Sequence, residues 1–246
     1  MNLIIIPLLL GWLAGWLVNY LADVLPVTRS FSHPVCPHCQ TPYPWGGYLL
    51  FHNCSTCGTP RKARPLIIQA VLTIAPVLLW VFPRPGFPFV LAFSLFIFLS
   101  LVFVIDLEHR LILHPVSLFG ALLALGIGIY LHGVVTTLIG GAVGFGIMLV
   151  FYFIGELYVR YMSRKRGITT DEVALGFGDV NLSGILGLLL GWPTISAGLL
   201  FAVLAGGLIS LFIILGMLIL KKYKAFTAIP YAPFLILSAL YLLYII

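Results

Sequence analysis

The chain has 246 residues, of which 61% are hydrophobic and only 8% are charged, whereas about 25% of residues are charged in an ordinary soluble domain. So few charges cannot cover a water-soluble surface, which excludes a soluble enzyme, a disordered chain and a nucleic-acid-binding domain despite a formal net charge of +6. At about 20 apolar residues per span, the length accommodates about eight spans and one small extramembrane domain.

Eight apolar runs predict membrane-spanning helices, because in lipid only helices and closed barrels satisfy every backbone hydrogen-bonding group. The runs are Asn2–Ala22, Leu66–Phe82, Phe89–Ile105, Pro115–Leu131, Val134–Tyr158, Ala174–Trp192, Ile195–Leu220 and Phe226–Ile246. The first is expected to be a retained span and not a cleaved signal, since Met1–Leu10 contains no Lys or Arg and no small-residue cleavage pattern follows it. The predicted fold class is an all-α membrane protein with about eight transmembrane helices.

One segment between the first two runs has a different composition. Asp23–Pro65 contains all four cysteines, seven of the sixteen prolines and no apolar run of spanning length. We therefore expect three parts: a first transmembrane helix over residues 1–22, a loop domain over 23–65, and a seven-helix core over 66–246.

The basic residues predict the orientation of the spans. If the first loop is cytoplasmic, twelve of the thirteen Lys and Arg residues fall on the cytoplasmic side and only Arg84 falls on the other, which is a strong positive-inside signal. The twelve are Arg29, Arg61, Lys62, Arg64, Arg110, Arg160, Arg164, Lys165, Arg166, Lys221, Lys222 and Lys224. Both termini are then expected to face outward, and binding of anionic membrane lipid is a lesser role for these residues.

The four cysteines form two Cys-x2-Cys pairs separated by fourteen residues. Cys36, Cys39, Cys54 and Cys57 are spaced as the ligands of one structural zinc ion. Two disulfides are the alternative, but a cytoplasmic loop is kept reduced. His38 and His52 are close in the sequence and are alternative ligands that could take the place of a cysteine. A metal would also stabilise a loop that is too short to form its own hydrophobic core.

Two of the seven acidic residues adjoin spans in a way that suggests chemistry. Asp106 follows the apolar run that ends at Ile105, and Asp179 follows Gly176-Phe177-Gly178 near the start of the sixth span. The predicted topology puts both acids at a similar shallow depth near the cytoplasmic face. Two such carboxyl groups can share a proton and hold a water molecule between them, which is the chemistry of an aspartic protease. The alternatives are an ordinary helix-end role for Asp106 and small-residue helix packing for the glycines, as in Gly140-x3-Gly144 and Gly187-x3-Gly191.

The remaining acids call for no catalytic role. Asp23, Glu108, Asp171 and Glu172 are expected in or beside loops, and Glu156 can pair with Arg160 one helical turn on. Gly176-x-Gly178 does not form a dinucleotide-binding loop, because Asn181 stands where the third glycine would be.

Nearly the whole chain resembles the type IV prepilin peptidases, which are GxGD-type intramembrane aspartic proteases. The resemblance is carried by motifs in chain order: Asn19 with Leu25-Pro26, Cys36-Pro37-His38-Cys39, Pro42-Tyr43-Pro44-Trp45, Cys54-x2-Cys57-Gly58, Arg64-Pro65-Leu66, Ile105-Asp106-Leu107-Glu108-His109, Gly176-Phe177-Gly178-Asp179 and Ile229-Pro230-Tyr231-Ala232-Pro233-Phe234.

The resemblance implies that Asp106 and Asp179 are the catalytic pair, with Gly176, Phe177 and Gly178 as the active-site motif. It implies cleavage of a basic leader from type IV prepilins or type II secretion pseudopilins at the cytoplasmic face of the bacterial inner membrane. It also implies N-methylation of the new N-terminus with S-adenosylmethionine, an activity associated with the cysteine loop.

The chain departs from the family pattern at four positions. Asn181 replaces a usual Lys, Gln69 a common Glu, Trp16 a usual Ser and Val24 a usual Arg. These differences leave three alternatives: an unusual substrate, a peptidase without methyltransferase activity, or a weakened enzyme. Two functions from other classes also stay open, namely a proton or cation transporter that uses both acids, and an inactive relative whose zinc loop docks an assembly machine.

Overall fold

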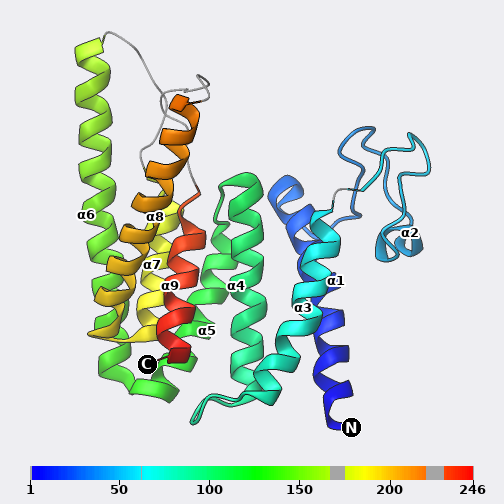
Figure 1. Cartoon of the computed structure of the whole chain (residues 1–246), viewed down its shortest axis with the longest axis horizontal. Coiled ribbons are helices and arrows are strands. Elements are labelled where there is room, and N and C mark those ends of the chain that lie inside the picture. Colours follow the sequence, from blue (N-terminus) through cyan, green and yellow to red (C-terminus); the bar gives the residue numbers. More distant parts are fainter. Residues whose placement is uncertain (1, 62, 167–174, 220–229, 246) are drawn as a thin grey trace. The chain divides into compact units, whose positions relative to one another are not determined.

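The computed structural model describes residues 2–61, 63–166, 175–219 and 230–245, and the regular secondary structure of this part of the chain consists of helices and one isolated bridge between Val35 and Pro42 (Figure 1). The helices are α1 (Asn2–Thr28), α2 (Trp45–Leu49), α3 (Arg64–Val81), α4 (Phe89–His109), α5 (His114–His132), α6 (Val134–Arg166), α7 (Phe177–Leu190), α8 (Thr194–Ile219) and α9 (Ala232–Ile245). The all-α membrane fold expected from composition is confirmed, with the short α2 as an addition inside the cysteine-containing loop.

The eight apolar helices fall into two groups, six that are long enough to span a membrane and two that are shorter. Six of them, α1, α3, α4, α5, α6 and α8, are long and apolar enough to cross a membrane. The other two, α7 and α9, have 14 residues each, or about 21 Å at 1.5 Å per residue, compared with about 30 Å for a hydrocarbon core. The predicted start of the last run, and Asp171 and Glu172, lie outside the described residues.

Three helices continue several residues beyond their predicted ends: α4 runs to His109 and not to Ile105, and α1 and α6 extend further still. α1 runs to Thr28 and not to Ala22, so residues 23–28 of the expected loop domain are helical. Pro26 sits within this extension, and the Thr28 hydroxyl donates to the carbonyl of Val24 at 2.9 Å, which satisfies a group in the last turn. α6 runs to Arg166 and not to Tyr158, which makes it 33 residues long, because polar and basic residues continue the helix where the apolar pattern stops.

The chain divides into two compact units, residues 1–105 and 106–246. In the first unit, α1 packs closely on α3 because Gly11 leaves room for the backbone of α3 at Leu72 and Thr73. The contact is also polar: Asn19 Nδ2 donates to the carbonyl of Pro65 at 3.1 Å, and Gln69 Nε2 donates to the carbonyl of Trp12 at 2.7 Å. Buried side-chain amides of this kind hold neighbouring membrane helices together.

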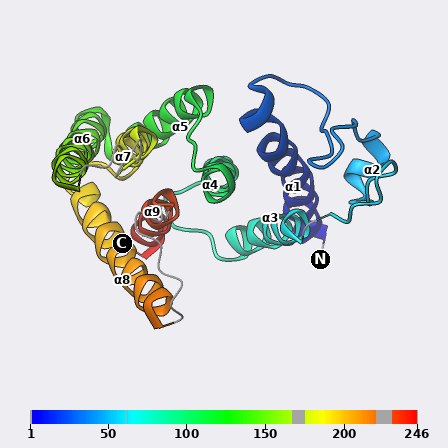
Figure 2. The ribbon, with the colours of Figure 1, turned by 90° about the horizontal axis from the view of Figure 1, so that it is seen from above.

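In the second unit, α5, α7 and α6 lie side by side, and α8 and α9 form a neighbouring pair (Figure 2). Glycines set the spacing of α6 and α7: the backbone at Gly187 fills the position where Gly140 would carry a Cβ, and the reverse also holds. Gly144 faces the carbonyl of Ser183 in the same way. The predicted small-residue packing through these glycines is confirmed, and it holds α7, which carries Asp179, firmly against α6.

Candidate active site and metal-binding loop

Asp106 lies in the last turn of α4, which ends at His109. Its carbonyl accepts a hydrogen bond from the amide of Arg110 at 2.9 Å, and Arg110 has a positive φ of 52° that turns the chain out of the helix. The residue is only 5% exposed. The backbone amide of Ala232 donates to its carboxyl group, while Oδ2 has no hydrogen-bond partner among the described residues.

Asp179 is the third residue of α7, and the start of this helix fixes its side chain. Gly176 is the N-cap residue, and its backbone amide donates to the Asp179 carboxyl group. A side chain at the third position that reaches back to the N-cap amide is half of a capping box, and its negative charge suits the positive end of the helix dipole. Asp179 is 9% exposed, and its Oδ1 has no partner within the described part of the chain.

The two acids lie within electrostatic reach of each other in the second unit. Asp106 is close enough for its charge to act on the Asp179 carboxyl group, and the charge of Asp179 in turn acts on the Tyr231 hydroxyl. Three unpaired buried polar atoms therefore gather here: Asp106 Oδ2, Asp179 Oδ1 and the Tyr231 hydroxyl. Buried polar groups are costly to leave without a partner, so this arrangement is suited to holding water and a polar substrate group.

The two other members of the predicted motif serve packing. Gly178 adjoins Ile112 so closely that an added Cβ would lie 2.9 Å from Ile112 Cβ, which confirms that a glycine here lets another segment approach. Phe177 is 46% exposed and its ring contacts Tyr152 and Phe145 of α6, at 5.8 and 6.5 Å between centroids. Its side chain thus joins α7 to α6.

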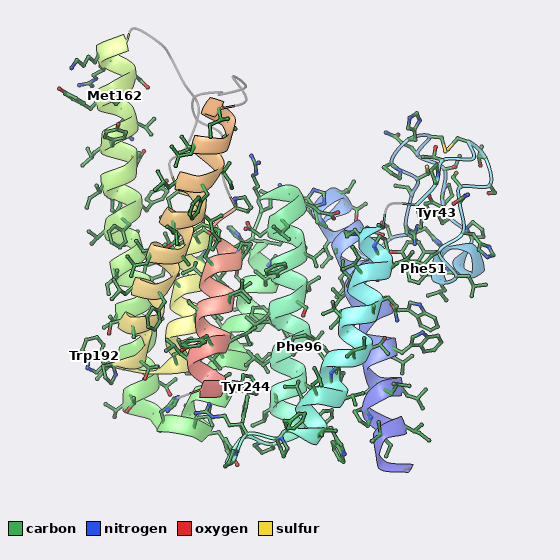
Figure 3. All side chains as sticks on the ribbon, viewed as in Figure 1. Tyr43, Phe51, Phe96, Met162, Trp192 and Tyr244 are labelled. Atoms are coloured by element: carbon green, nitrogen blue, oxygen red, sulfur yellow. The ribbon has the colours of Figure 1, made fainter. Side chains whose placement is uncertain are left out.

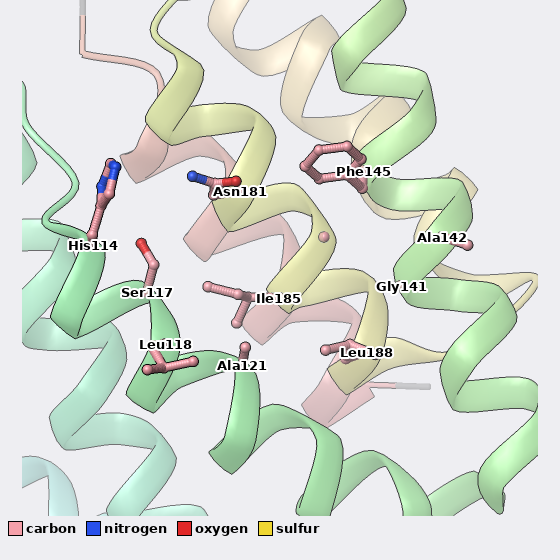
Figure 4. A pocket seen from close by; sticks show the side chains of 11 residues that line it. His114, Ser117, Leu118, Ala121, Gly141, Ala142, Phe145, Asn181, Ile185 and Leu188 are labelled. Carbon is pink, nitrogen blue, oxygen red and sulfur yellow. The ribbon is translucent and has the colours of Figure 1, made fainter.

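An open hollow of about 480 Å³ lies on the opposite face of α7 (Figure 4). It is lined by residues of α5, α6 and α7, with His114, Ser117 and Asn181 as its polar side chains. Asn181 is two residues from Asp179, or about 200° around the helix. Since the partners of Asp179 lie on α4 and at the start of α9, this hollow is separate from the pair of acids.

The cysteines in the first unit form one cluster that can hold a metal ion. The Sγ atoms of Cys36, Cys39, Cys54 and Cys57 all lie within 4.8 Å of one another. The separations of 3.7 Å for Cys36–Cys57 and 3.6 Å for Cys39–Cys54 match the roughly 3.8 Å expected between sulfurs bound tetrahedrally at 2.3 Å from zinc. All four cysteines are free thiols, so the alternative of two disulfides is not what the structure contains.

The two Cys-x2-Cys segments fold alike. The amides of Gln40 and Gly58 donate to the carbonyls of Cys36 and Cys54, at 2.9 Å in both cases. Gln40 and Gly58 both have positive φ, 56° and 68°. Each segment thus bends back in the same way and directs its two sulfurs to a common point.

Backbone amides favour the thiolate form at both leading cysteines, which fits the electronic needs of a metal ligand. Hydrogen bonds from the amides of Cys39 and His38 lower the pKa of Cys36. The amides of Cys57 and Thr56 lower the pKa of Cys54 to about 6.

Asp23 anchors this loop to the end of α1, a role that sequence reasoning did not assign to it. Its carboxylate accepts a 2.6 Å hydrogen bond from the Tyr48 hydroxyl and forms ion pairs with Arg64 and, at 3.6 Å, with Arg61. Burial, together with the charge of Asp23, raises the pKa of Tyr48. The Arg61 guanidinium lies 4.1 Å from the centre of the Tyr48 ring and 5.0 Å from that of Tyr43. Tyr43 and Phe51 are labelled in this part of the chain in Figure 3.

Other acids and nearby histidines lie as follows. Glu156 pairs with Arg160 at 2.5 Å on the exposed side of α6, which confirms the predicted pairing. His38 and His52 are not part of the four-sulfur cluster. Tyr231 and the amide of Ala232 are the groups at the acid pair that motif reasoning did not single out, although both stand in the quoted Pro230-Tyr231-Ala232-Pro233 stretch.

Comparison with known proteins gives consistent results. The profile of the Type IV leader peptidase family matches residues 93–214, which include both acids. The chain is 25% identical over 223 residues to the "Prepilin leader peptidase/N-methyltransferase" of Aeromonas hydrophila, which covers 88% of this chain and 72% of the relative.

Two further relatives carry the same name. The protein from Legionella pneumophila is 29% identical over 225 residues, covering 86% of this chain and 70% of the relative. The protein from Pectobacterium carotovorum subsp. carotovorum is 30% identical over 186 residues, covering 72% and 62%. No solved structure matches the chain.

Proposed function

Since the chain belongs to the type IV leader peptidase family, we propose that it is a membrane-embedded aspartic endopeptidase in which Asp106 and Asp179 are the catalytic residues. The observation that carries this proposal is the meeting of two buried carboxyl groups, each with one unpaired oxygen, from helices that are far apart in the sequence. Such a pair is built to share one proton.

The pair would cleave a peptide bond by general acid–base catalysis. The ionised acid takes a proton from a bound water molecule, whose oxygen attacks the carbonyl carbon, while the protonated acid donates its proton to the carbonyl oxygen. Collapse of the tetrahedral intermediate then breaks the C–N bond: the acid that took the proton from water gives it to the nitrogen, and the other acid takes back the proton that it gave to the oxygen. The amide of Ala232 on Asp106 and that of Gly176 on Asp179 hold the two carboxyl groups in place.

The proposed substrates are type IV prepilins or type II secretion pseudopilins, and the proposed location is the cytoplasmic side of the bacterial inner membrane. The name shared by the relatives supports the substrate class. The asymmetry of twelve basic residues against Arg84 supports the side of the membrane. The proposed division remains the one expected from the sequence, a first transmembrane helix, a loop domain over residues 23–65 and a seven-helix core over 66–246, except that residues 23–28 belong to α1.

The test is cleavage of a co-expressed prepilin. Asp106→Asn and Asp179→Asn should each lower cleavage by about 10²–10⁴-fold while the protein still inserts into the membrane. The matched control is Glu156→Gln, which removes a partly exposed acid that pairs with Arg160 of the same helix and should leave cleavage unchanged. Full cleavage by either Asp variant would refute the mechanism, and acid-dependent proton flux in liposomes without proteolysis would favour the transporter alternative.

We propose zinc as the metal of the four cysteines, in a structural role. The close spacing of the four sulfurs supports a closed tetrathiolate site. Zinc should be present in one equivalent in the purified protein and absent from Cys36→Ser, whose Pro34–Pro60 segment should become sensitive to protease. A zinc-free wild-type protein with an intact, protease-resistant loop would contradict this.

The second proposed activity is N-methylation of the newly exposed N-terminus, with S-adenosylmethionine as donor. The relatives' name supports it, but the hollow beside α7 does not fit this donor, because no carboxylate, Lys or Arg is among its lining residues. We therefore assign no methyl-transfer step to particular side chains. Mass spectrometry of processed pilin tests it directly, since a single methyl group adds a defined mass and its absence would show a peptidase alone.

A further inference from the structure

Tyr231 occupies a fixed position immediately before α9. Its carbonyl accepts hydrogen bonds from the amides of Phe234 at 3.0 Å and Leu235 at 3.4 Å, so it forms the N-terminal cap of that helix. The next residue, Ala232, is the one whose amide donates to Asp106. The backbone that positions Tyr231 is therefore the same backbone that touches one of the two acids.

The ring of Tyr231 is braced from two sides. It contacts Phe234 with 6.3 Å between ring centroids. On the facing helix α8, a Cβ at Gly206 would lie 3.2 Å from Tyr231 Cε2, so the absence of a side chain at Gly206 makes room for the ring. A ring held in this way can direct its hydroxyl group with little freedom.

The hydroxyl group is buried near the acids and has no hydrogen-bond partner among the residues described. It lies within electrostatic reach of Asp179, whose Oδ1 is also unpaired, as is Oδ2 of Asp106. A tyrosine directly bonded to Asp179 would leave neither atom unpaired. Among the described residues none of these three atoms bonds another, so each has the capacity to bond a water molecule or a polar group of a substrate.

We propose that Tyr231 is a third catalytic residue, whose hydroxyl group donates a hydrogen bond to the carbonyl oxygen of the peptide bond being cleaved. This inference rests on the proposed function. A phenol keeps its proton at neutral pH, so it can stabilise the oxygen as it gains negative charge without transferring a proton. The two acids remain responsible for every proton that moves, and Tyr231 contributes a fixed donor aimed at the developing charge.

Tyr231→Phe removes only this hydroxyl group and tests the proposal. With a purified enzyme and a prepilin substrate, kcat should fall by about 10²-fold, as for the loss of one oxyanion donor, while KM changes little. The matched control is Tyr241→Phe on the same helix, where the side chain is half exposed and its ring contacts Phe201; this variant should keep the wild-type kcat.

A second variant tests the same hydroxyl without removing it. Gly206→Ala adds a methyl group against the Tyr231 ring and should lower kcat in the wild-type background. In the Tyr231→Phe background it should lower kcat much less, because the misplaced group is already missing. A purely structural role would give equal effects of Gly206→Ala in both backgrounds and would overturn the proposal.

The outcomes separate this inference from the function on which it rests. If the wild-type protein cleaves prepilin and both Asp variants do not, but Tyr231→Phe retains the wild-type kcat, the role of Tyr231 is refuted and the peptidase stands. A change in KM with an unchanged kcat would also refute the catalytic role of Tyr231. If the wild-type protein itself leaves prepilin intact, the proposed function fails.

Discussion

Gly176 and Gly178 lie in the same short stretch before Asp179, yet they meet different surroundings. A Cβ at Gly178 would lie 2.9 Å from Ile112 Cβ, closer than side chains tolerate. A Cβ at Gly176 would lie 3.4 Å from Asp179 Oδ2 and 4.0 Å from the amide nitrogen of Gly178, which are ordinary contacts, and the φ of Gly176 is −71°, which any residue adopts. The two glycines of the motif should therefore differ in how far they tolerate a methyl group.

Gly178→Ala should destabilise the second unit by about 1–3 kcal/mol, the usual effect of overpacking, and should lower cleavage because α7 must shift. Gly176→Ala should cost less than about 1 kcal/mol, as expected for alanine at an N-cap. Thermal inactivation of prepilin cleavage for the two variants provides the comparison. An equal loss of stability in both variants would mean that the close approach of Ile112 is not the reason why position 178 requires glycine.

The sequence allowed us to predict the roles of residues that depend on partners a few positions away. The Cys-x2-Cys pairs, the glycines of α6 and α7 and the Glu156–Arg160 pair could be anticipated because each depends on neighbours a few residues apart. Asp23 and Tyr231 could not, since their partners are remote: Asp23 meets Tyr48, Arg61 and Arg64, and Tyr231 meets Asp179 and Gly206. An acid beside a loop or an aromatic residue in an apolar chain has no local sign of such contacts.

At the scale of elements, the extension of α1 to Thr28 provides the attachment point of the cysteine loop. The added turns include Asp23, which holds Tyr48 at the end of α2 and the two arginines that precede and begin α3. The loop has only a small buried core, formed by Cys36, Tyr43, Tyr48 and Cys54. Its attachment to the helices therefore depends on these polar contacts as well as on the cluster of sulfurs.

Asp23→Asn should loosen the loop from α1 without emptying the metal site. The change removes the charge that Arg61 and Arg64 share, and a hydrogen bond to a charged group contributes about 2 kcal/mol. Limited proteolysis within residues 29–61 should become faster. Zinc content and the binding of prepilin to the membrane fraction are the controls, and both should stay unchanged. Loss of zinc together with the faster proteolysis would show that attachment and metal binding are not separable.

At the scale of the whole molecule, the distribution of charge predicts the side on which each loop lies. Twelve basic residues lie in loops or helix ends that the predicted topology puts on one side of the bilayer, and only Arg84 falls on the other. A reporter that is active only in the cytoplasm should therefore be active when inserted after Arg110 and inactive when inserted after Arg84. The reverse pattern would invert the topology and place both the cysteine loop and the acid pair on the outer side.

The short length of α7 also bears on which bond of a substrate can reach Asp179. α7 measures about 21 Å beside an α6 of about 50 Å, and Asp179 stands at its third residue. If Asp179 is catalytic, as proposed above, a substrate anchored in the bilayer by an apolar segment has to present its bond at a set depth, and we predict that distance along the substrate helps to select the bond. Insertion of two residues between the apolar segment and the cleaved bond of a prepilin should slow cleavage or move the cut, and an unchanged cut at an unchanged rate would mean that residue identity alone selects the bond.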